Sequence, residues 1–387
     1  MIKEGDMMES FMNFIPTKFF FGVGELDKLG EVALPGKKAL VVISSGKSVR
    51  KTGTLDRVLR LLKQNGVSFV IFDKIQPNPI LAQVTEGAQV SKTEKCDFVL
   101  GLGGGSSIDS AKAIAVMATN PGNYWDYIGS GSGKAQPLQK TPLPIVAITT
   151  TAGTGTEVDP WCVITNGNEK IGFGCEGTFP TLAIIDPELM KTVPPKLTAY
   201  QGFDALFHAS EGFLSKMATP ISEAYSLKSI ELIFKSLPAA IADGNNMEAR
   251  TGMAMANTIS GMVESTSTCG SEHSLAHAIS GLFPNVPHGA ALIMVSLAWF
   301  KFFSSRLPDR FVAMGKAAGH RDFMSALKSL QLECDVIGLQ MSDFGIGSED
   351  LKKINDNAWE TMGKLFDVVR VKMTRADSLD IYMESYR

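Results

Sequence analysis

Residues 97–109 read Asp97-Phe-Val-Leu-Gly-Leu-Gly-Gly-Gly-Ser-Ser-Ile-Asp109, and this stretch indicates how the first half of the chain folds. Its apolar start predicts a buried strand, and the residues from about Ser107 to Ala118 predict a helix. Glycines between a strand and a helix let the backbone approach a phosphate, which the free N–H groups at the helix start can bind. A tight strand–helix turn is the alternative interpretation, but the three consecutive glycines around Gly104 favour a phosphate site.

Strand and helix patterns alternate on both sides of this loop. Helical spacing of leucine and valine over 55–62, closed by Gly66, predicts a helix. Alternation of this kind implies a parallel sheet with helices on both faces, so we expect a Rossmann-like α/β domain over residues 1–194. The further apolar runs that predict its strands are 39–43, 68–72, 145–149 and 183–185.

The pattern changes after Pro194-Pro195. From about Ala199 onward we find helical periodicity and no convincing strand, and Thr374 with Asp377 predicts a capping box for the last helix. We therefore expect an all-helical, metal-binding domain over residues 195–387. The cleft between the two domains is the expected ligand site.

A lysine and several serines follow the first strand of the predicted sheet, in Ser44-Ser-Gly-Lys-Ser48. The segment is not a P-loop, because Val41 stands where the first glycine belongs. Adenosine ribose is usually recognised at this point, and NAD-selective sites place a carboxylate there. The absence of a carboxylate in this segment favours NADP(H) over NAD(H), with a solvated loop as the alternative. The residues expected at the 2′-phosphate are Ser45, Gly46, Lys47 and Ser48.

A second segment rich in hydroxyl groups, Thr149-Thr-Thr-Ala-Gly-Thr-Gly-Thr-Glu157, directly follows the strand predicted at 145–149. Its hydroxyls and glycines suit hydrogen bonds to a phosphate or to the nicotinamide ribose. A helix entry capped by threonine is the alternative interpretation.

Four of the five histidines fall in two short regions of the predicted helical domain. Asp204 and His208 are four residues apart and project from one helix face, and His273 and His277 repeat this spacing. His288 follows a proline-containing turn. Neutral imidazoles with a carboxylate suit Fe(II), Zn(II), Ni(II) or Co(II), and an open position on such a metal polarises an alcohol or carbonyl oxygen. The cluster therefore predicts a catalytic metal.

Composition excludes several other classes of function. A net charge of −3 over 387 residues gives no strong attraction to nucleic acid or to an anionic membrane. Five dispersed cysteines without a C-x-x-C pair exclude a thiolate zinc ribbon and a redox dithiol. Residues 1–10 are charged and lack the apolar run of an export signal, and the run at 290–303 is too short for a membrane span. We expect a cytoplasmic enzyme acting on a small molecule, with no nucleic-acid or membrane partner.

Taken together, the motifs resemble the iron-containing (group III) alcohol dehydrogenase family. The resemblance runs over nearly the whole chain, from Phe20-Phe-Gly-Val-Gly24 through Thr150-Thr-Ala-Gly-Thr154 and Gly202-Phe-Asp-Ala-Leu-Phe-His208 to Glu272-His-Ser-Leu-Ala-His277. It implies the two-domain architecture also found in dehydroquinate synthase. It further implies a commonly homodimeric enzyme that transfers hydride between NAD(P) and a small primary alcohol or aldehyde. Fe(II) is the metal that the resemblance favours, with Zn(II) and Ni(II) as alternatives.

The resemblance also implies roles for individual residues. The metal ligands that it implies are Asp204, His208, His273 and His288. His277 is implied to lie near the substrate, as a candidate for proton relay. The cofactor contacts that it implies are Asn78, Gly105, Ser106, Asp109, Thr150, Thr151, Thr154 and Lys170. The spacing from His273 to His288 is one residue longer than in many relatives, which leaves His277 open as the third ligand in place of His273.

Other functions remain open from the sequence. A glycerol-dehydrogenase-like polyol oxidoreductase would use a similar site. A lyase like dehydroquinate synthase would need basic residues for a phosphorylated substrate, and segments 204–211 and 273–288 contain no Lys or Arg. A non-catalytic metal-binding protein would not need the glycine loop. Apolar neighbours of the histidines, such as Phe207 and Leu275, predict a small neutral alcohol or aldehyde as substrate.

Overall fold

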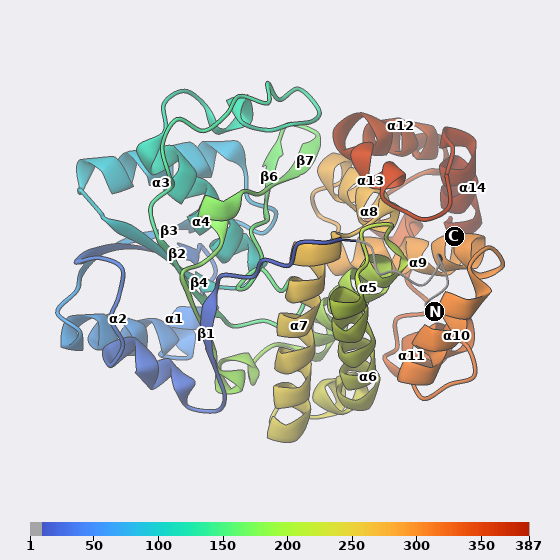
Figure 1. Ribbon diagram of the computed structural model, residues 1–387, viewed down its shortest axis with the longest axis horizontal. Helices are drawn as coiled ribbons and strands as arrows, with labels where there is room; N and C mark the ends of the chain where they lie inside the picture. Colours follow the sequence, from blue (N-terminus) through green and yellow to red (C-terminus); the bar gives the residue numbers. More distant parts are fainter. Residues whose placement is uncertain (1–9, 387) are drawn as a thin grey trace, which may run out of the picture.

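A six-stranded sheet forms the centre of the N-terminal half of the chain (Figure 1). The computed structural model describes residues 10–386; the charged segment 1–9, on which the expectation about an export signal largely rests, lies outside them. The strand order is β1-β8-β5-β4-β2-β3, and every neighbouring pair is parallel. The strands are β1 Lys18–Phe21, β2 Lys38–Ser44, β3 Ser68–Ile75, β4 Phe98–Gly103, β5 Ile145–Thr149 and β8 Leu182–Ile185.

Helices cover both faces of this sheet because successive strand residues point to opposite sides. In β2, Leu40 and Val42 pack with residues of α3 (Leu81–Thr93) and α4 (Gly105–Thr119). Val41 and Ile43 instead face a cluster that includes residues of α2 (Thr54–Gln64). The α/β sandwich with a parallel sheet, predicted from the alternating strand and helix patterns, is confirmed.

The sequence patterns missed an antiparallel hairpin that lies outside the main sheet. Its strands are β6 (Cys162–Asn166) and β7 (Glu169–Phe173), and Asn166 pairs with Glu169. The two residues between the strands include Gly167 at φ 60°, a conformation that glycine adopts without steric cost. The hairpin matters for the site, because Lys170 on β7 lines the cavity described below.

The second half is helical, as predicted. Within residues 195–386, apart from a bridge between Ser215 and Val369, the structure holds helices, turns and irregular segments. The capping box predicted for the last helix is present: Thr374 Oγ1 accepts from the Asp377 backbone, and Asp377 Oδ2 accepts from the Thr374 backbone. The helices are α5 Pro195–Leu214, α6 Pro220–Ala242, α7 Met247–Ser267, α8 Ser271–Leu282, α9 His288–Ser304, α10 Pro308–Ala317, α11 Phe323–Glu333, α12 Leu351–Met362, α13 Lys364–Asp367 and α14 Arg375–Ser385.

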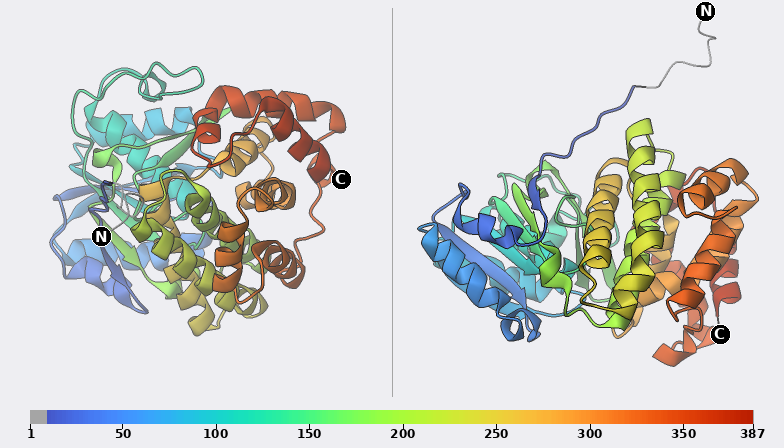
Figure 2. Two further views of the ribbon diagram at one scale, coloured as in Figure 1. Left: turned by 45° about the vertical axis from the view of Figure 1, so that its right-hand side comes forward. Right: turned by 90° about the horizontal axis from the view of Figure 1, so that it is seen from below.

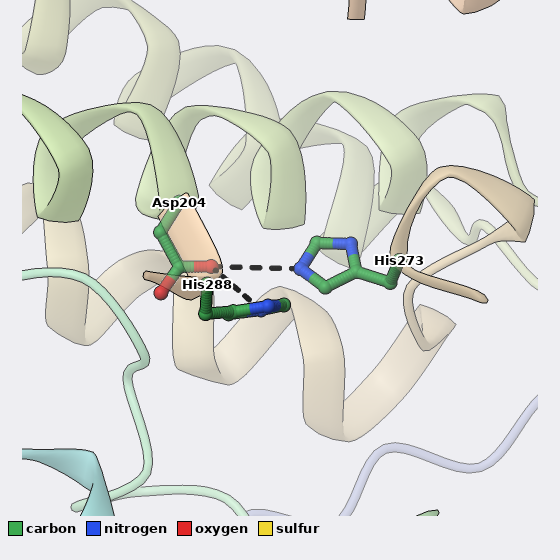
Figure 3. A group of neighbouring side chains, drawn as sticks. All are labelled: Asp204, His273 and His288. Carbon is green, nitrogen blue, oxygen red and sulfur yellow. Dashed lines mark ion pairs between the residues drawn. The ribbon is translucent and has the colours of Figure 1, made fainter. Parts of the chain in front are cut away.

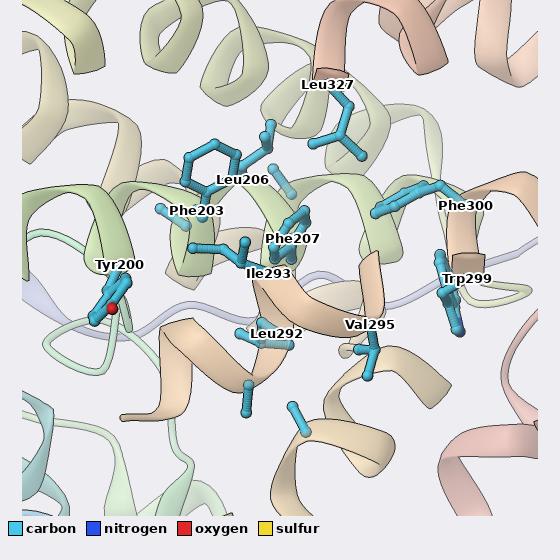
Figure 4. Close-up of a cluster of buried hydrophobic side chains, with 14 of the residues drawn as sticks. Tyr200, Phe203, Leu206, Phe207, Leu292, Ile293, Val295, Trp299, Phe300 and Leu327 are labelled. Carbon is cyan, nitrogen blue, oxygen red and sulfur yellow. The ribbon is translucent and has the colours of Figure 1, made fainter. Parts of the chain in front are cut away.

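Helix α5 runs through the core of this half. Its Phe203, Leu206 and Phe207 pack with residues of α9 such as Phe300 (Figure 4). Nearly all of α5 from Thr198 to Leu214 is buried, so a polar residue on it faces either a polar partner or a cavity. The two halves of the chain lie side by side in both views of Figure 2. None of the helices in the described residues is long and apolar enough to cross a membrane.

Candidate metal and cofactor site

A cavity of about 490 Å³ is lined by residues of both halves of the chain. Gly105, Ser106 and Thr154 line it from the α/β half. The histidine cluster lines it from the helical half, with Asp204 and four of the chain's five histidines. The remaining histidine, His320, lies away from this cavity and contacts Phe234. The glycine loop and the histidine cluster, about a hundred residues apart in sequence, thus share one cavity.

Three helices bring the histidine cluster together. Asp204 and His208 lie on α5, His273 on α8, and His288 at the start of α9. Asp204 Oδ1 is 3.6 Å from His208 Nδ1, 3.6 Å from His273 Nε2 and 3.6 Å from His288 Nε2. Figure 3 shows the rings of His273 and His288 converging on the Asp204 carboxylate. One carboxylate oxygen therefore lies among three imidazole rings.

The cluster meets the requirements of a metal site. Asp204 Oδ1, His208 Nδ1 and His273 Nε2 are buried and have no hydrogen-bond partner. Buried polar atoms without partners are rare in folded proteins, and here they face one another. Ligand atoms of Asp204, His273 and His288 all lie within 4.8 Å of one another. A divalent cation in contact with these atoms would satisfy them.

Burial keeps two of the candidate ligands in the form that metals bind. Burial lowers the pKa of His208 to about 4, assisted by the nearby His273, and it holds the pKa of His288 well below its ordinary value. Burial alone would also lower the pKa of His273, but Glu211 and Asp204 on either side of the ring outweigh this effect and raise it. The space between Asp204 and His273 therefore favours a positive charge.

Two glutamates that the sequence patterns did not single out support the rings. Glu211 Oε2 contacts His273 Nδ1, and its other oxygen accepts from the Glu272 backbone at 2.8 Å. Glu264 Oε2 lies 3.4 Å from His208 Nε2. A carboxylate behind a metal-binding imidazole fixes the orientation of the ring and raises its basicity. Glu211 lies one turn beyond His208 on α5, but the contacts of both glutamates depend on how α5, α7 and α8 pack.

His277 lies on α8 in the wall of the same cavity. Its Nδ1 is 2.8 Å from Met362 Sδ, and burial holds its pKa well below the ordinary value for histidine. The imidazole is therefore neutral near pH 7. It lies beside the cluster, with its ring centroid 4.9 Å from that of His288, but the three histidines that lie 3.6 Å from Asp204 Oδ1 are His208, His273 and His288.

The glycine loop leaves little room between β4 and the segment that follows β5. A Cβ added to Gly105 would lie 2.7 Å from Thr154 Cγ2, and one added to Gly104 would lie 3.0 Å from Thr151 Cγ2. Thr150 N donates to Gly103 O at 2.9 Å, which fixes the two segments against each other. The backbone at the start of α4 is thus exposed to the cavity at Gly105 and Ser106, where N–H groups and the helix dipole favour an anion.

Three other predicted cofactor residues have polar partners within the protein. Lys170 Nζ donates to Asn78 Oδ1 at 2.9 Å, and Asn78 Nδ2 donates to Pro284 O at 3.1 Å. Burial lowers the pKa of Lys170 to about 8. Asp109 accepts from Thr156 Oγ1 and from the backbone of Val163, and burial raises its pKa to about 6. Asn78, Lys170 and Asp109 all line the cavity.

The segment predicted to bind the 2′-phosphate lies outside this cavity. Ser45, Gly46, Lys47 and Ser48 are exposed and follow the C-terminal end of β2. Because β2 and β4 are parallel neighbours, this segment and the glycine loop lie at the same edge of the sheet. A dinucleotide that extends along this edge would reach both.

Comparisons with known proteins agree with this architecture. The model of the family described as "iron-containing alcohol dehydrogenase" matches residues 16–187, and the model of the C-terminal part of that family matches residues 198–386. A choline dehydrogenase of Bacillus subtilis is 38% identical over 319 residues, which are 81% of this chain and 78% of that protein. An NAD-dependent methanol dehydrogenase of Bacillus methanolicus is 34% identical over 361 residues, 90% of this chain and 93% of that protein.

A solved structure has the same fold over almost the whole chain. It is the crystal structure of an archaeal halo-thermophilic alcohol dehydrogenase from a Red Sea brine pool. The TM-score is 0.93 at 32% sequence identity, covering 98% of this chain and all of that one.

Proposed function

The chain belongs to the iron-containing alcohol dehydrogenase family and is a metal-dependent, nicotinamide-linked alcohol dehydrogenase, and from this premise we propose how its residues divide the work. Asp204, His208, His273 and His288 hold the metal. Gly104, Gly105 and Ser106 bind the pyrophosphate of the cofactor, and the other cofactor contacts come from Asp109, Asn78, Thr150, Thr151, Thr154 and Lys170.

One observation carries this assignment. Asp204 Oδ1, His208 Nδ1 and His273 Nε2 are buried, converge on one another and lack hydrogen-bond partners, in a cavity that the glycine loop also lines. A divalent metal bound there supplies Lewis-acid polarisation of an alcohol or carbonyl oxygen. The shared cavity positions a substrate at the histidine cluster within reach of the nicotinamide of a cofactor whose pyrophosphate binds at Gly105 and Ser106.

His277 is the residue that we propose to move the proton. Its buried ring is neutral near pH 7, and Met362 Sδ lies against Nδ1, so we propose Nε2 as the atom through which a proton passes. In alcohol oxidation, the ring would receive the hydroxyl proton through this nitrogen. In aldehyde reduction, the ring would donate a proton from the same nitrogen to the substrate oxygen.

We propose a small neutral primary alcohol or aldehyde as substrate. The cavity is lined by apolar side chains such as Trp161, Phe173 and Leu365, alongside the polar cluster. Choline and methanol, which name two of the relatives, are both primary alcohols; methanol is neutral, whereas choline carries a quaternary ammonium charge and supports only the primary-alcohol part of the proposal. We also propose Fe(II) as the native metal and a homodimer, as the family resemblance implies, and a cytoplasmic location, as the dispersed cysteines indicate.

Hydride transfer by protein stripped of metal and re-supplied with Fe(II), Zn(II), Ni(II) or no metal tests this function. NADPH or NADH oxidation with a panel of short aldehydes should appear only when a metal is added. The most active metal identifies the preferred ion. Activity on a sugar phosphate with none on short aldehydes, or equal activity without metal, would contradict the proposal.

We propose NADP(H) as the preferred cofactor because Lys47 is exposed at the edge of the sheet where the adenosine ribose would lie. Lys47→Glu should shift the preference ratio of NADPH to NADH by about tenfold towards NADH, since a unit charge a few ångströms from a phosphate contributes about 1–4 kcal/mol near a protein surface. Steady-state kcat/KM with each cofactor measures the ratio. Lys51→Glu, the same charge change one turn further along α1 (Ser48–Lys51), is the control. An unchanged ratio in Lys47→Glu would refute the assignment of this segment.

A further inference from the structure

A lysine that none of these roles includes is buried at the centre of the structure. Lys112 lies on α4, two turns after the glycine loop, and its side chain has no exposed surface. Its Nζ donates to Thr156 Oγ1 at 2.7 Å, to Asp159 Oδ1 at 2.9 Å and to Trp161 O at 2.7 Å. It also lies 2.8 Å from Asp159 O. A fully buried ammonium group is costly unless it is paired and fully hydrogen-bonded, as this one is.

One arm of this network leads to the cofactor loop. Thr156 Oγ1, the group that accepts from Lys112, donates to Asp109 Oδ1 at 2.8 Å. Asp109 lies on α4 between Lys112 and the glycine loop, and it lines the cavity beside Gly105 and Ser106. The position of α4 relative to the segment 156–161 is therefore fixed by buried polar contacts at two successive turns.

The other arm leads to the metal cluster. Asp159, the ion-pair partner of Lys112, lies beside the side chain of Glu264 on α7, and both residues line the cavity. Glu264 Oε2 in turn lies 3.4 Å from His208 Nε2. Trp161 Nε1 also donates to the backbone oxygen of Glu264, at 3.5 Å. A continuous series of polar contacts thus joins a candidate metal ligand to the helix that begins at the cofactor loop.

The segment after β5, which contains Thr156 and Asp159, is also hydrogen-bonded to helix α7 of the helical half. Glu157 Oε1 accepts from Asn257 Nδ2 at 2.7 Å and from Thr258 Oγ1 at 2.9 Å, both on α7. Gly155 N donates to Asn257 Oδ1 at 2.8 Å. Because both ends of the segment are fixed, a displacement of Glu264 would be transmitted to Lys112 and α4 rather than absorbed by a flexible loop.

We propose that Lys112 is a positioning residue that couples metal binding at His208 to dinucleotide binding at the start of α4. The inference rests on the proposed function. A cation at the cluster orders His208 and, through Glu264 and Asp159, the ion pair with Lys112. Lys112 then holds α4 and its phosphate-binding backbone in the bound arrangement. Coupling of this kind is reciprocal, so the cofactor also tightens metal binding by the same factor.

Binding measurements without turnover test the coupling. NADPH fluorescence titrations of metal-free protein and of protein saturated with Zn(II) give two dissociation constants for each variant. We expect Zn(II) to tighten NADPH binding by about fivefold or more in the unmodified protein, the lower end of typical coupling. In Lys112→Met, the ratio of the NADPH dissociation constant without Zn(II) to the constant with Zn(II) should fall close to one. Thr156→Val, which removes only the hydroxyl between Lys112 and Asp109, should also reduce it and serves if Lys112→Met does not fold.

A second buried cation provides the matched control. Arg250 on α7 is also buried and hydrogen-bonds to Thr198 Oγ1 and to backbone oxygens, away from the cavity. Arg250→Met should lower thermal stability but leave the ratio of the two NADPH dissociation constants unchanged. If Zn(II) still tightens NADPH binding in both Lys112→Met and Thr156→Val, the inference is overturned. Direct attraction between Zn(II) and the cofactor would then be enough to explain the effect. An unmodified protein that turns over with metal but shows no coupling would also overturn it, whereas failure to bind Zn(II) or NADPH at all would refute the proposed function.

Discussion

Replacement of His208 by alanine is expected to abolish metal retention and to lower kcat/KM by about 10³-fold. His208 Nδ1 is one of the three partnerless atoms around the centre of the cluster, and its neighbour Asp204 would lose the imidazole 3.6 Å away. Lewis-acid polarisation contributes several kcal/mol to the transition state, and each 1.36 kcal/mol is tenfold in rate. Metal content by elemental analysis and aldehyde reduction with NADPH measure the two effects.

Two further histidine variants distinguish the loss of a metal ligand from the loss of a histidine that does not bind the metal. His320→Ala, at an exposed position away from the cavity, should retain both metal and activity. His277→Ala should retain metal but lose turnover, because His277 lies in the cavity wall against Met362, whereas His208, His273 and His288 each lie 3.6 Å from Asp204 Oδ1. Full activity in His208→Ala would refute the ligand assignment. Loss of metal in His277→Ala, with metal retained in His273→Ala, would exchange the roles of those two residues.

Helix spacing predicted the residue pairs of the metal cluster, whereas the complete ligand set, with His288, was predicted from the family resemblance. Asp204 and His208 share one face of α5 because they are four residues apart, and His273 and His277 do so on α8. No such sequence signal marks Glu264 and Lys112. Glu and Lys in a helix are usually exposed, so their burial here cannot be recognised from the sequence. Their contacts join α4, the segment after β5, and α7, and Lys112 and Glu264 are about 150 residues apart in the sequence. Only the packed structure brings them together.

The same distinction explains which elements of the fold were predicted. Strands β2, β4 and β5 are buried on both faces and appear in the sequence as continuous apolar runs. Strand β1 is only four residues long and half-exposed at the edge of the sheet, so its short run of phenylalanines, Phe19 to Phe21, was not identified as a strand. The β6–β7 hairpin could have been found, because Gly167-Asn168 between two strand-like runs is a two-residue hairpin signal.

A methyl group at Gly105 is expected to weaken NADPH binding by roughly 5- to 150-fold. The Cβ of Gly105→Ala would lie 2.7 Å from Thr154 Cγ2, too close for any real contact, so the start of α4 or the threonine must shift. Overpacking of this kind costs about 1–3 kcal/mol, and here the strain falls on the backbone that binds the phosphates. Alanine is a better helix former than glycine, so the stability of α4 itself should not fall. NADPH titration and thermal unfolding of the same variant measure these effects separately.

The double variant Gly105→Ala/Thr154→Ser distinguishes steric pressure from a direct need for glycine. Serine removes Cγ2, the atom nearest the added methyl group, but keeps the hydroxyl that Thr154 offers to the cavity. If the clash displaces the phosphate-binding backbone, the double variant should recover most of the lost affinity. Gly338→Ala, in a surface turn with no atom within 4 Å of the new Cβ, should bind NADPH normally. A double variant as weak as Gly105→Ala would mean that the methyl group itself occupies space needed by the cofactor. The close approach of phosphate to backbone, rather than the fit of Gly105 against Thr154, would then be the reason for glycine at this position.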